Sequence, residues 1–213
     1  MDEKIVSAIK KARESKKRNF KQTFDLAINL KGIDLKKPEN KIKTEAFLPN
    51  GFGKSVKIGI IADNLIPVVN RLGDKSIILI GKGQLENLGA DKKALKKVAS
   101  ECKSFIAEAP LMPLVGRYLG PVLAVRNKMP KPIPPTLSDL KPITEKAKNT
   151  LQIALKNSPV IHCAVGFEDM PDEKIAENIE AVLKAVKAAL PKGDEQIKNF
   201  VIKLSMGKAI RVG

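Results

Sequence analysis

The chain has 213 residues, 43% of them hydrophobic, enough for one large domain or two modest ones with a core. Its 39 basic against 23 acidic residues give a net charge of +16, which favours a polyanionic partner, nucleic acid first, over a solvated lysine-rich surface. No apolar run approaches the roughly 20 residues that cross a bilayer, and the start lacks an apolar signal core, so we expect a cytoplasmic protein without membrane contact.

The first predicted element is a basic amphipathic helix over residues 2–18. Its apolar positions, Ile5, Ala8, Ile9 and Ala12, recur at helical spacing. From residue 24 the pattern becomes an alternation, which predicts a strand with one buried and one solvated face. The apolar positions of this strand are Phe24, Leu26, Ile28 and Leu30. A second strand is predicted over residues 42–48.

Residues 48–55 (LPNGFGKS) form a candidate hinge, because they hold a proline and two glycines and the strand pattern changes beyond them. Three short apolar segments follow, at residues 56–62, 76–80 and 104–109, and they alternate with helical patterns. Strands that are apolar on both faces and alternate with helices indicate a parallel α/β sheet.

The proline-rich segment 127–135 is predicted to interrupt regular structure before a short helix near residues 140–149. The one-sided strand pattern then returns. Segments 150–156 and 160–166 alternate around Asn157-Ser158-Pro159, which predicts a hairpin of these two strands. A helix over 172–190, acidic in its first turn, and a strand from residue 200 to about 204 follow.

Both ends of the chain share one strand pattern, and the middle has another. We therefore expect an α/β fold of two domains: a discontinuous α+β domain from residues 1–54 and 150–213, and an inserted parallel-sheet, Rossmann-like α/β domain from residues 55–149. Basic residues outnumber acidic ones by 14 to 7 in 1–54, by 16 to 8 in 55–149 and by 9 to 8 in 150–213, so the positive field comes from the first two blocks.

The sequence offers little for catalysis. His162 precedes Cys163, but neighbours in a strand point to opposite faces, which argues against a Cys–His dyad. The acidic pairs Glu168-Asp169 and Asp172-Glu173 are better explained as stabilising a helix start. Cys102 and Cys163 have neither CxxC spacing nor neighbouring histidine ligands, so we expect two small buried side chains and no metal site or disulfide.

One enzyme hypothesis stays open as the alternative. Gly81-Lys82-Gly83 follows an apolar segment and resembles the start of a dinucleotide-binding turn, in which glycines let the backbone approach a pyrophosphate. The third glycine of that motif is out of register, and the same residues suit an ordinary strand-to-helix turn. The alternative function is therefore a nucleotide-binding α/β enzyme; the preferred function uses no cofactor.

Basic runs near the N-terminus give a stronger indication of function. Clustered cations raise affinity for phosphates by counterion release but read no sequence. Phe20, directly after the first run, suits an exposed RNA contact and core packing equally. The cations are Lys10, Lys11, Arg13, Lys16, Lys17 and Arg18, followed by Lys36, Lys37, Lys41 and Lys43.

Near the C-terminus, Ser205-Met206-Gly207 breaks an otherwise apolar strand between lysines (KLSMGKAIRV). In the sequence, neither packing nor a tight turn accounts for this break. We interpret it as an edge on which RNA docks.

These residues resemble the family of the large-subunit ribosomal protein L-one, the mobile stalk protein, in its archaeal type. The resemblance covers nearly the whole chain. It rests on Asn19-Phe20 with Thr23, on LPNG, GRYLGP, KMPKP and AVG, and above all on Ser205-Met206-Gly207, which is similar to the family's Thr-Met-Gly signature. The chain departs from the family at residues 124–127, where Ala-Val-Arg-Asn replaces Gly-Pro-Arg-Gly.

The resemblance implies a non-enzymatic protein whose discontinuous domain binds large-subunit rRNA. By carry-over, the central RNA contact is formed by Phe20, Thr23, Ser205, Met206 and Gly207, with nearby lysines such as Lys203 and Lys43 on phosphates. Gly207 would admit the RNA backbone, Ser205 would offer its hydroxyl to a 2′-OH, and Met206 would supply apolar contact.

The resemblance also implies contact with exiting tRNA that assists its release, and repression of translation by binding the protein's own mRNA. It further implies a monomer outside the ribosome and a location in the cytoplasmic large subunit. A third hypothesis, a nonspecific basic chaperone of nucleic acids, predicts binding that salt abolishes uniformly.

Overall fold

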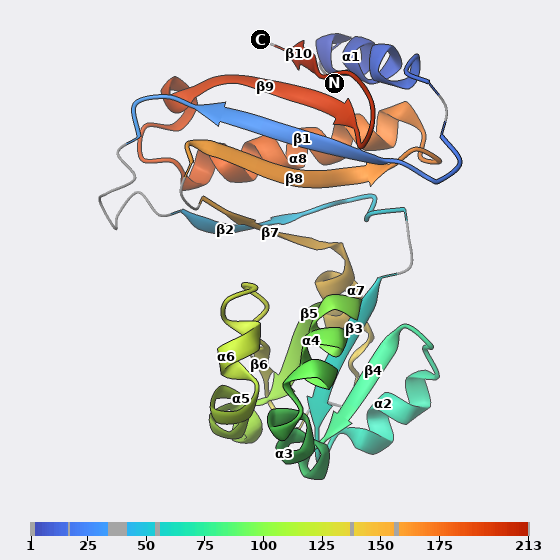
Figure 1. Ribbon diagram of the computed structural model, residues 1–213, viewed down its shortest axis with the longest axis vertical. Helices are drawn as coiled ribbons and strands as arrows, with labels where there is room; N and C mark the ends of the chain where they lie inside the picture. Colours follow the sequence, from blue (N-terminus) through green and yellow to red (C-terminus); the bar gives the residue numbers. More distant parts are fainter. Residues whose placement is uncertain are drawn as a thin grey trace. The chain divides into compact units, whose positions relative to one another are not determined.

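The computed structural model describes residues 3–16, 18–33, 42–53, 56–136, 139–155 and 158–212. The chain divides into two compact units: unit 1 contains Met1–Lys54 and Asn149–Gly213, and unit 2 contains Ser55–Lys148. Unit 1 holds antiparallel strands, whereas the sheet of unit 2 is parallel (Figure 1). This combination of sheets confirms the predicted α/β fold class.

Unit 1 contains a four-stranded sheet in the order β10-β9-β1-β8 and a two-stranded sheet of β2 and β7. Helices α1 and α8 contact each other and pack on one face of the larger sheet (Figure 1). The elements are α1 (Glu3–Arg13), β1 (Thr23–Leu30), β2 (Lys43–Phe47), β7 (Thr150–Ala154), β8 (Val160–Phe167), α8 (Asp172–Ala189), the 3-10 helix η3 (Gly193–Gln196), β9 (Ile197–Leu204) and β10 (Ile210–Val212).

Strand β1 lies between β9 and β8 and alternates as predicted. Phe24, Leu26, Ile28 and Leu30 are buried, whereas the residues between them are partly exposed. The apolar set packs under the two helices, because burying it there removes its side chains from water. Within the described part of unit 1 the two long helices cover only this face, and Asp25, His162 and Lys203 meet on the other face, which we call the open face.

The predicted hairpin of residues 150–156 and 160–166 is wrong. Strand β7 pairs with β2, with Leu151 opposite Ala46, and β8 pairs with β1, with Ile161 opposite Ile28. The prediction took neighbours in sequence as partners in the sheet. Strand β8 instead pairs with the equally long β1, whose buried face shares the core under the helices, and the short β7 pairs with the equally short β2. Asn157 lies outside the described residues.

The C-terminal segment also differs from its prediction. Strand β9 starts at Ile197 rather than at residue 200, and β10, which was not predicted, pairs back on it with Ile210 opposite Ile202. Ser205, Met206 and Gly207 form the turn between them, closed by a hydrogen bond from Gly207 N–H to Leu204 O at 2.9 Å. A tight turn therefore does account for the break in the strand.

Unit 2 contains a parallel sheet in the order β4-β3-β5-β6, and helices connect its strands. Both faces are buried as predicted: Phe105 belongs to one apolar cluster and its neighbour Ile106 to another. The elements are β3 (Lys57–Ala62), α2 (Ile66–Leu72), β4 (Ile77–Gly81), α3 (Lys82–Ala90), α4 (Lys92–Glu101), β5 (Cys102–Glu108), the 3-10 helix η2 (Ala109–Leu111), α5 (Met112–Tyr118), α6 (Gly120–Leu123), β6 (Lys131–Ile133) and α7 (Lys141–Asn149).

Strand β6 corrects the expectation that residues 127–135 lack regular structure. It pairs in parallel with β5, with Pro132 opposite Ala107. A proline has no N–H to donate, but an edge strand needs donors on one side only, so β6 tolerates it at the end of the sheet.

The LPNG segment is anchored within unit 1 by Asn178 of α8, which is fully buried. The Asn178 side-chain amide donates to the carbonyls of Gly51 (2.9 Å) and Val165 (2.8 Å), and its oxygen accepts the Asn50 N–H (3.2 Å). Gly51 has a φ of 60°, which glycine adopts readily. Residues 48–51, the first half of the candidate hinge, are therefore tied into unit 1 by hydrogen bonds.

Replacing Asn178 with alanine should lower the free energy of unfolding by about 2–4 kcal/mol, because it leaves backbone groups of three residues without buried partners. Urea denaturation followed by circular dichroism measures this change. Lys184→Ala, at an exposed position of the same helix, should shift it by less than about 0.5 kcal/mol. Equal effects of the two substitutions would contradict the anchoring role.

The partly buried Lys103 in β5 should make the free energy of unfolding depend on pH. Its ammonium group donates to Lys148 O at 2.9 Å, and burial lowers its pKa from 10.5 to about 7. Between these two values the unfolded chain holds a proton that the folded chain has lost, so the free energy of unfolding rises with pH across that window. Urea denaturation at several pH values should show a shallower rise in Lys103→Met, whereas exposed Lys75→Met should keep the wild-type slope.

Candidate nucleic-acid interface

The Ser205–Gly207 turn is tied to the start of β1. Ser205 N–H donates to Thr23 O at 3.1 Å, and Thr23 N–H donates to Ser205 Oγ at 3.2 Å. Next to this pair, Met206 N–H donates to Oε1 of the buried Gln22 at 3.2 Å. The turn and residues 20–23 therefore form one corner of unit 1, and we call this set the turn corner.

Ser205 and Gly207 have roles inside the protein. The Ser205 hydroxyl, expected to meet an RNA 2′-OH, is the acceptor for Thr23 N–H. A Cβ at Gly207 would lie 2.9 Å from Ser15 Oγ and 3.1 Å from Leu204 Cβ, so the glycine lets the segment after α1 approach the turn. Both residues shape the turn corner whether or not RNA is bound.

Phe20 and Met206 are the large apolar side chains that the turn corner exposes. Phe20 is 50% exposed, which excludes core packing, and Met206 is 65% exposed. An aromatic ring and a flexible thioether among cations suit stacking and apolar contact with unpaired bases. Phe20 and Met206 are therefore exposed where a partner can contact them.

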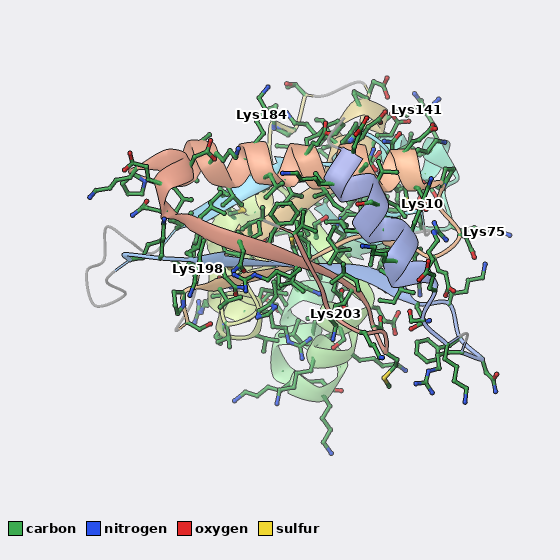
Figure 2. The ribbon with its side chains drawn as sticks, turned by 90° about the horizontal axis from the view of Figure 1, so that it is seen from above. Lys10, Lys75, Lys141, Lys184, Lys198 and Lys203 are labelled. Carbon is green, nitrogen blue, oxygen red and sulfur yellow. The ribbon has the colours of Figure 1, made fainter. Side chains whose placement is uncertain are left out.

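Cations surround the turn corner. Lys203, partly exposed, lies on β9 two residues before Ser205, and Figure 2 shows it toward the end of β9 opposite Lys198, with Lys10 on α1. Exposed cations on α1, on the segment after it and beside the turn include Lys10, Lys11, Lys16, Arg18 and Lys208. Lys17, Lys36, Lys37 and Lys41, which the sequence also suggested, lie outside the described residues.

Arg13 belongs to the same basic run but is engaged inside the protein. Its Nε donates to Asp172 Oδ1 at 2.6 Å, and its other nitrogens donate to the carbonyls of Glu168 and Met170. The guanidinium also lies 5.3 Å from the centre of the Phe24 ring, within cation–π range. Arg13 is therefore a clamp between α1 and the loop that precedes α8.

Lys43 lies at the other end of unit 1. It starts β2 and pairs with Ala154, the last residue of β7. The chain continues from there to β8, whose first residue, Val160, pairs with Asn29 near the end of β1. Thr23 and Ser205 lie at the opposite end of β1, about 20 Å away along the strand. The structure brings together Phe20, Thr23, Lys203, Ser205, Met206 and Gly207, but it does not bring Lys43 to them.

The loop after β8 positions residues 21 and 22, which sequence reasoning did not foresee. Glu168 N–H donates to Gln22 O at 2.9 Å, its carboxylate accepts Gln22 N–H at 3.2 Å, and Asp169 pairs with Lys21. The sequence did contain one indication of these contacts. Gln22 is in phase with the buried positions Phe24 and Leu26, and a polar residue at a buried position needs hydrogen-bond partners inside the protein.

The residues considered for catalysis do not form a site among the residues described. His162 is exposed and Cys163 buried, on opposite faces of β8 as predicted. Burial raises the pKa of the Cys163 thiol to about 12 and that of the Cys102 thiol to about 11, which keeps both protonated at neutral pH. The described residues hold no group of three His, Cys, Asp or Glu suited to a metal, nor any helix long and apolar enough to span a bilayer.

Gly81-Lys82-Gly83 is the turn from β4 into α3. The Gly81 N–H donates to Gln84 Oε1 at 3.3 Å, so the side chain of the helix's own first turn takes up this donor. The arrangement is that of the ordinary strand-to-helix turn.

These features define a basic two-unit α/β protein with an antiparallel and a parallel unit. Residues 10–208 match the sequence model described as the ribosomal protein L1p/L10e family, and the chain belongs to that family. It is 50% identical over 212 residues to "Large ribosomal subunit protein uL1" of Pyrococcus abyssi, covering 99% of this chain and 95% of the relative.

Two further relatives carry the same description. The protein of Methanothermobacter thermautotrophicus is 46% identical over 213 residues, with all of both chains covered. That of Methanocaldococcus jannaschii is 45% identical over 212 residues, covering 99% of this chain and 95% of the relative. The resemblance to the archaeal type of the family is confirmed.

The free energies of unfolding of two variants should show that Arg13 holds the fold together whereas Lys10 is only a surface cation. Arg13→Ala should lower the free energy of unfolding by about 2–3 kcal/mol, because a part-buried aspartate and two carbonyls lose a charged donor. Lys10→Ala should leave it within about 0.5 kcal/mol. Urea denaturation measures both, and a clamp role for Arg13 is wrong if the two variants unfold alike.

Proposed function

We propose that this protein is a structural component of the large ribosomal subunit and binds large-subunit rRNA through the turn corner. The observation that carries the proposal is the exposure of Phe20 and Met206 on a backbone fixed by Thr23, Ser205 and Gln22. A rigid corner with exposed apolar groups recognises RNA shape, and the surrounding cations supply salt-dependent affinity. The relatives' common description as large ribosomal subunit proteins supports the assignment.

The residues of the interface divide into two groups. Phe20 and Met206 contact RNA directly, and Lys203 with its neighbouring cations holds phosphates. Thr23, Ser205 and Gly207 fix the backbone that presents them. Lys43 stays a separate prediction of a phosphate contact, at the far end of unit 1.

Finer roles follow from family membership and are part of the proposal. The protein forms the mobile stalk near the tRNA exit site and assists tRNA release. It represses translation by binding its own mRNA at a site that mimics the rRNA, is a monomer outside the ribosome, and works in the cytoplasm without catalysis. Residues 1–54 with 150–213 are the RNA-binding domain, and 55–149 the inserted domain, an assignment that the two compact units support.

Two alternatives are separated from this proposal by binding measurements. A nucleotide-binding α/β enzyme would be stabilised against heat by nucleotides rather than by structured RNA. A nonspecific nucleic-acid chaperone would bind an rRNA stalk fragment and an unrelated duplex of equal length with affinities that fall together as salt rises.

Met206→Asp tests the proposed contact. A carboxylate at this exposed position would face phosphates, and such like-charge contact costs several kcal/mol, so affinity for the stalk fragment should fall by about 100-fold or more. The same variant should lose affinity for the protein's own mRNA, and its free energy of unfolding should stay within about 0.5 kcal/mol. Fluorescence anisotropy over a salt series measures the affinities.

Val125→Asp is the matched control, since it places the same charge on an exposed apolar residue of unit 2. It should weaken binding less than Met206→Asp does. Unchanged affinity of Met206→Asp at moderate salt would show that the turn corner does not contact the RNA.

A further inference from the structure

The open face of the four-stranded sheet carries a hollow directly beside the turn corner. Asp25, Ala27, His162, Ala164 and Lys203, from β1, β8 and β9, line it. Thr23 and Ser205 are joined by hydrogen bonds, and the next pair along β1 and β9 on the same face is Asp25 opposite Lys203. The hollow therefore begins one step along the strands from the Thr23–Ser205 hydrogen bonds and continues the proposed interface.

Small side chains create the hollow. Asp25 has Ala164 as its other neighbour, and Ala27 lies between His162 and Val201. Because neither alanine fills the space above the sheet, a flat group can lie against the backbone there. Farther along the same face, Asn29 lies opposite Asn199.

The hollow presents an acceptor and a donor side by side. Asp25 is only partly exposed; burial raises the pKa of its carboxyl, while Lys203 and His162 act in the opposite direction. A carboxylate is out of place in a surface that only holds phosphates, because it repels them. It fits a surface that reads bases, since carboxylates accept hydrogen bonds from ring N–H and amino groups.

We propose that this hollow binds one unpaired guanine of the RNA, with Asp25 accepting from the guanine N1–H and N2 amino group and Lys203 donating to O6. Guanine fits because its Watson–Crick edge carries adjacent donors beside an acceptor, the complement of the Asp25–Lys203 pair. Single-stranded bases of RNA are commonly recognised on this edge. The inference rests on the proposed function and adds to it a residue that selects the base.

Asp25→Asn gives a test in which two explanations predict opposite signs. The substitution removes a negative charge, so a purely electrostatic interface would bind RNA as well or more tightly. If Asp25 accepts hydrogen bonds from guanine, the variant should bind the rRNA stalk fragment about tenfold more weakly, with an unchanged salt dependence. Glu195→Gln, the same charge change at an exposed residue before β9, should not weaken binding.

The RNA supplies the second half of the test. Replacing unpaired guanosines of the fragment by inosine, one at a time, removes the N2 amino group. One replacement should weaken wild-type binding about tenfold but leave Asp25→Asn unaffected, because the two changes remove the same contact. Lys203→Met should weaken binding while keeping the inosine effect. Thermal melting of each variant confirms that it is folded.

The outcomes separate the inference from the function on which it rests. Wild-type protein that fails to prefer the stalk fragment over an unrelated duplex overturns both. A clear preference combined with equal or tighter binding by Asp25→Asn overturns the guanine site alone. The same holds if every inosine replacement affects wild type and variant equally.

Discussion

The turn corner depends on the contacts that Arg13 makes at the end of α1. Its guanidinium binds Asp172 and the carbonyls of Glu168 and Met170, which fixes the loop before α8. That loop holds Gln22, and Gln22 holds the N–H of Met206. Arginine suits this position, because its planar group donates several hydrogen bonds in fixed directions. The contacts of the partly buried Arg13 thus help to position the residues of the turn corner.

The residues of the RNA interface therefore have two kinds of task. Ser205, Gly207 and Thr23 shape the turn through backbone hydrogen bonds and close packing, while Phe20 and Met206 remain exposed. Rigid support lowers the entropic cost of binding, because the contacting groups are already in place before the partner binds. The family signature around Ser205 accordingly combines residues that build the surface with a residue that contacts the partner.

Strand patterns were predictable wherever burial was one-sided or complete. Phe24 to Leu30 alternates because helices cover one face only, and the apolar segments of unit 2 are buried on both faces. Pairing was less predictable: β7 and β8 follow each other in sequence but pair with β2 and β1. The short strands β6 and β10 could not be predicted, since a segment of three residues is too short to show a periodic pattern.

The sequence by itself determined the fold class, the family and the basic character of the protein, because periodicity, motifs and net charge are local or additive properties. The tertiary structure decided which cations are free: Arg13 turned inward while Lys10 stayed exposed, although both come from one run. It also placed Asp25 beside Lys203 and kept Lys43 away from the turn corner. Such assignments depend on strand register and on contacts between residues far apart in the chain, which no local pattern encodes.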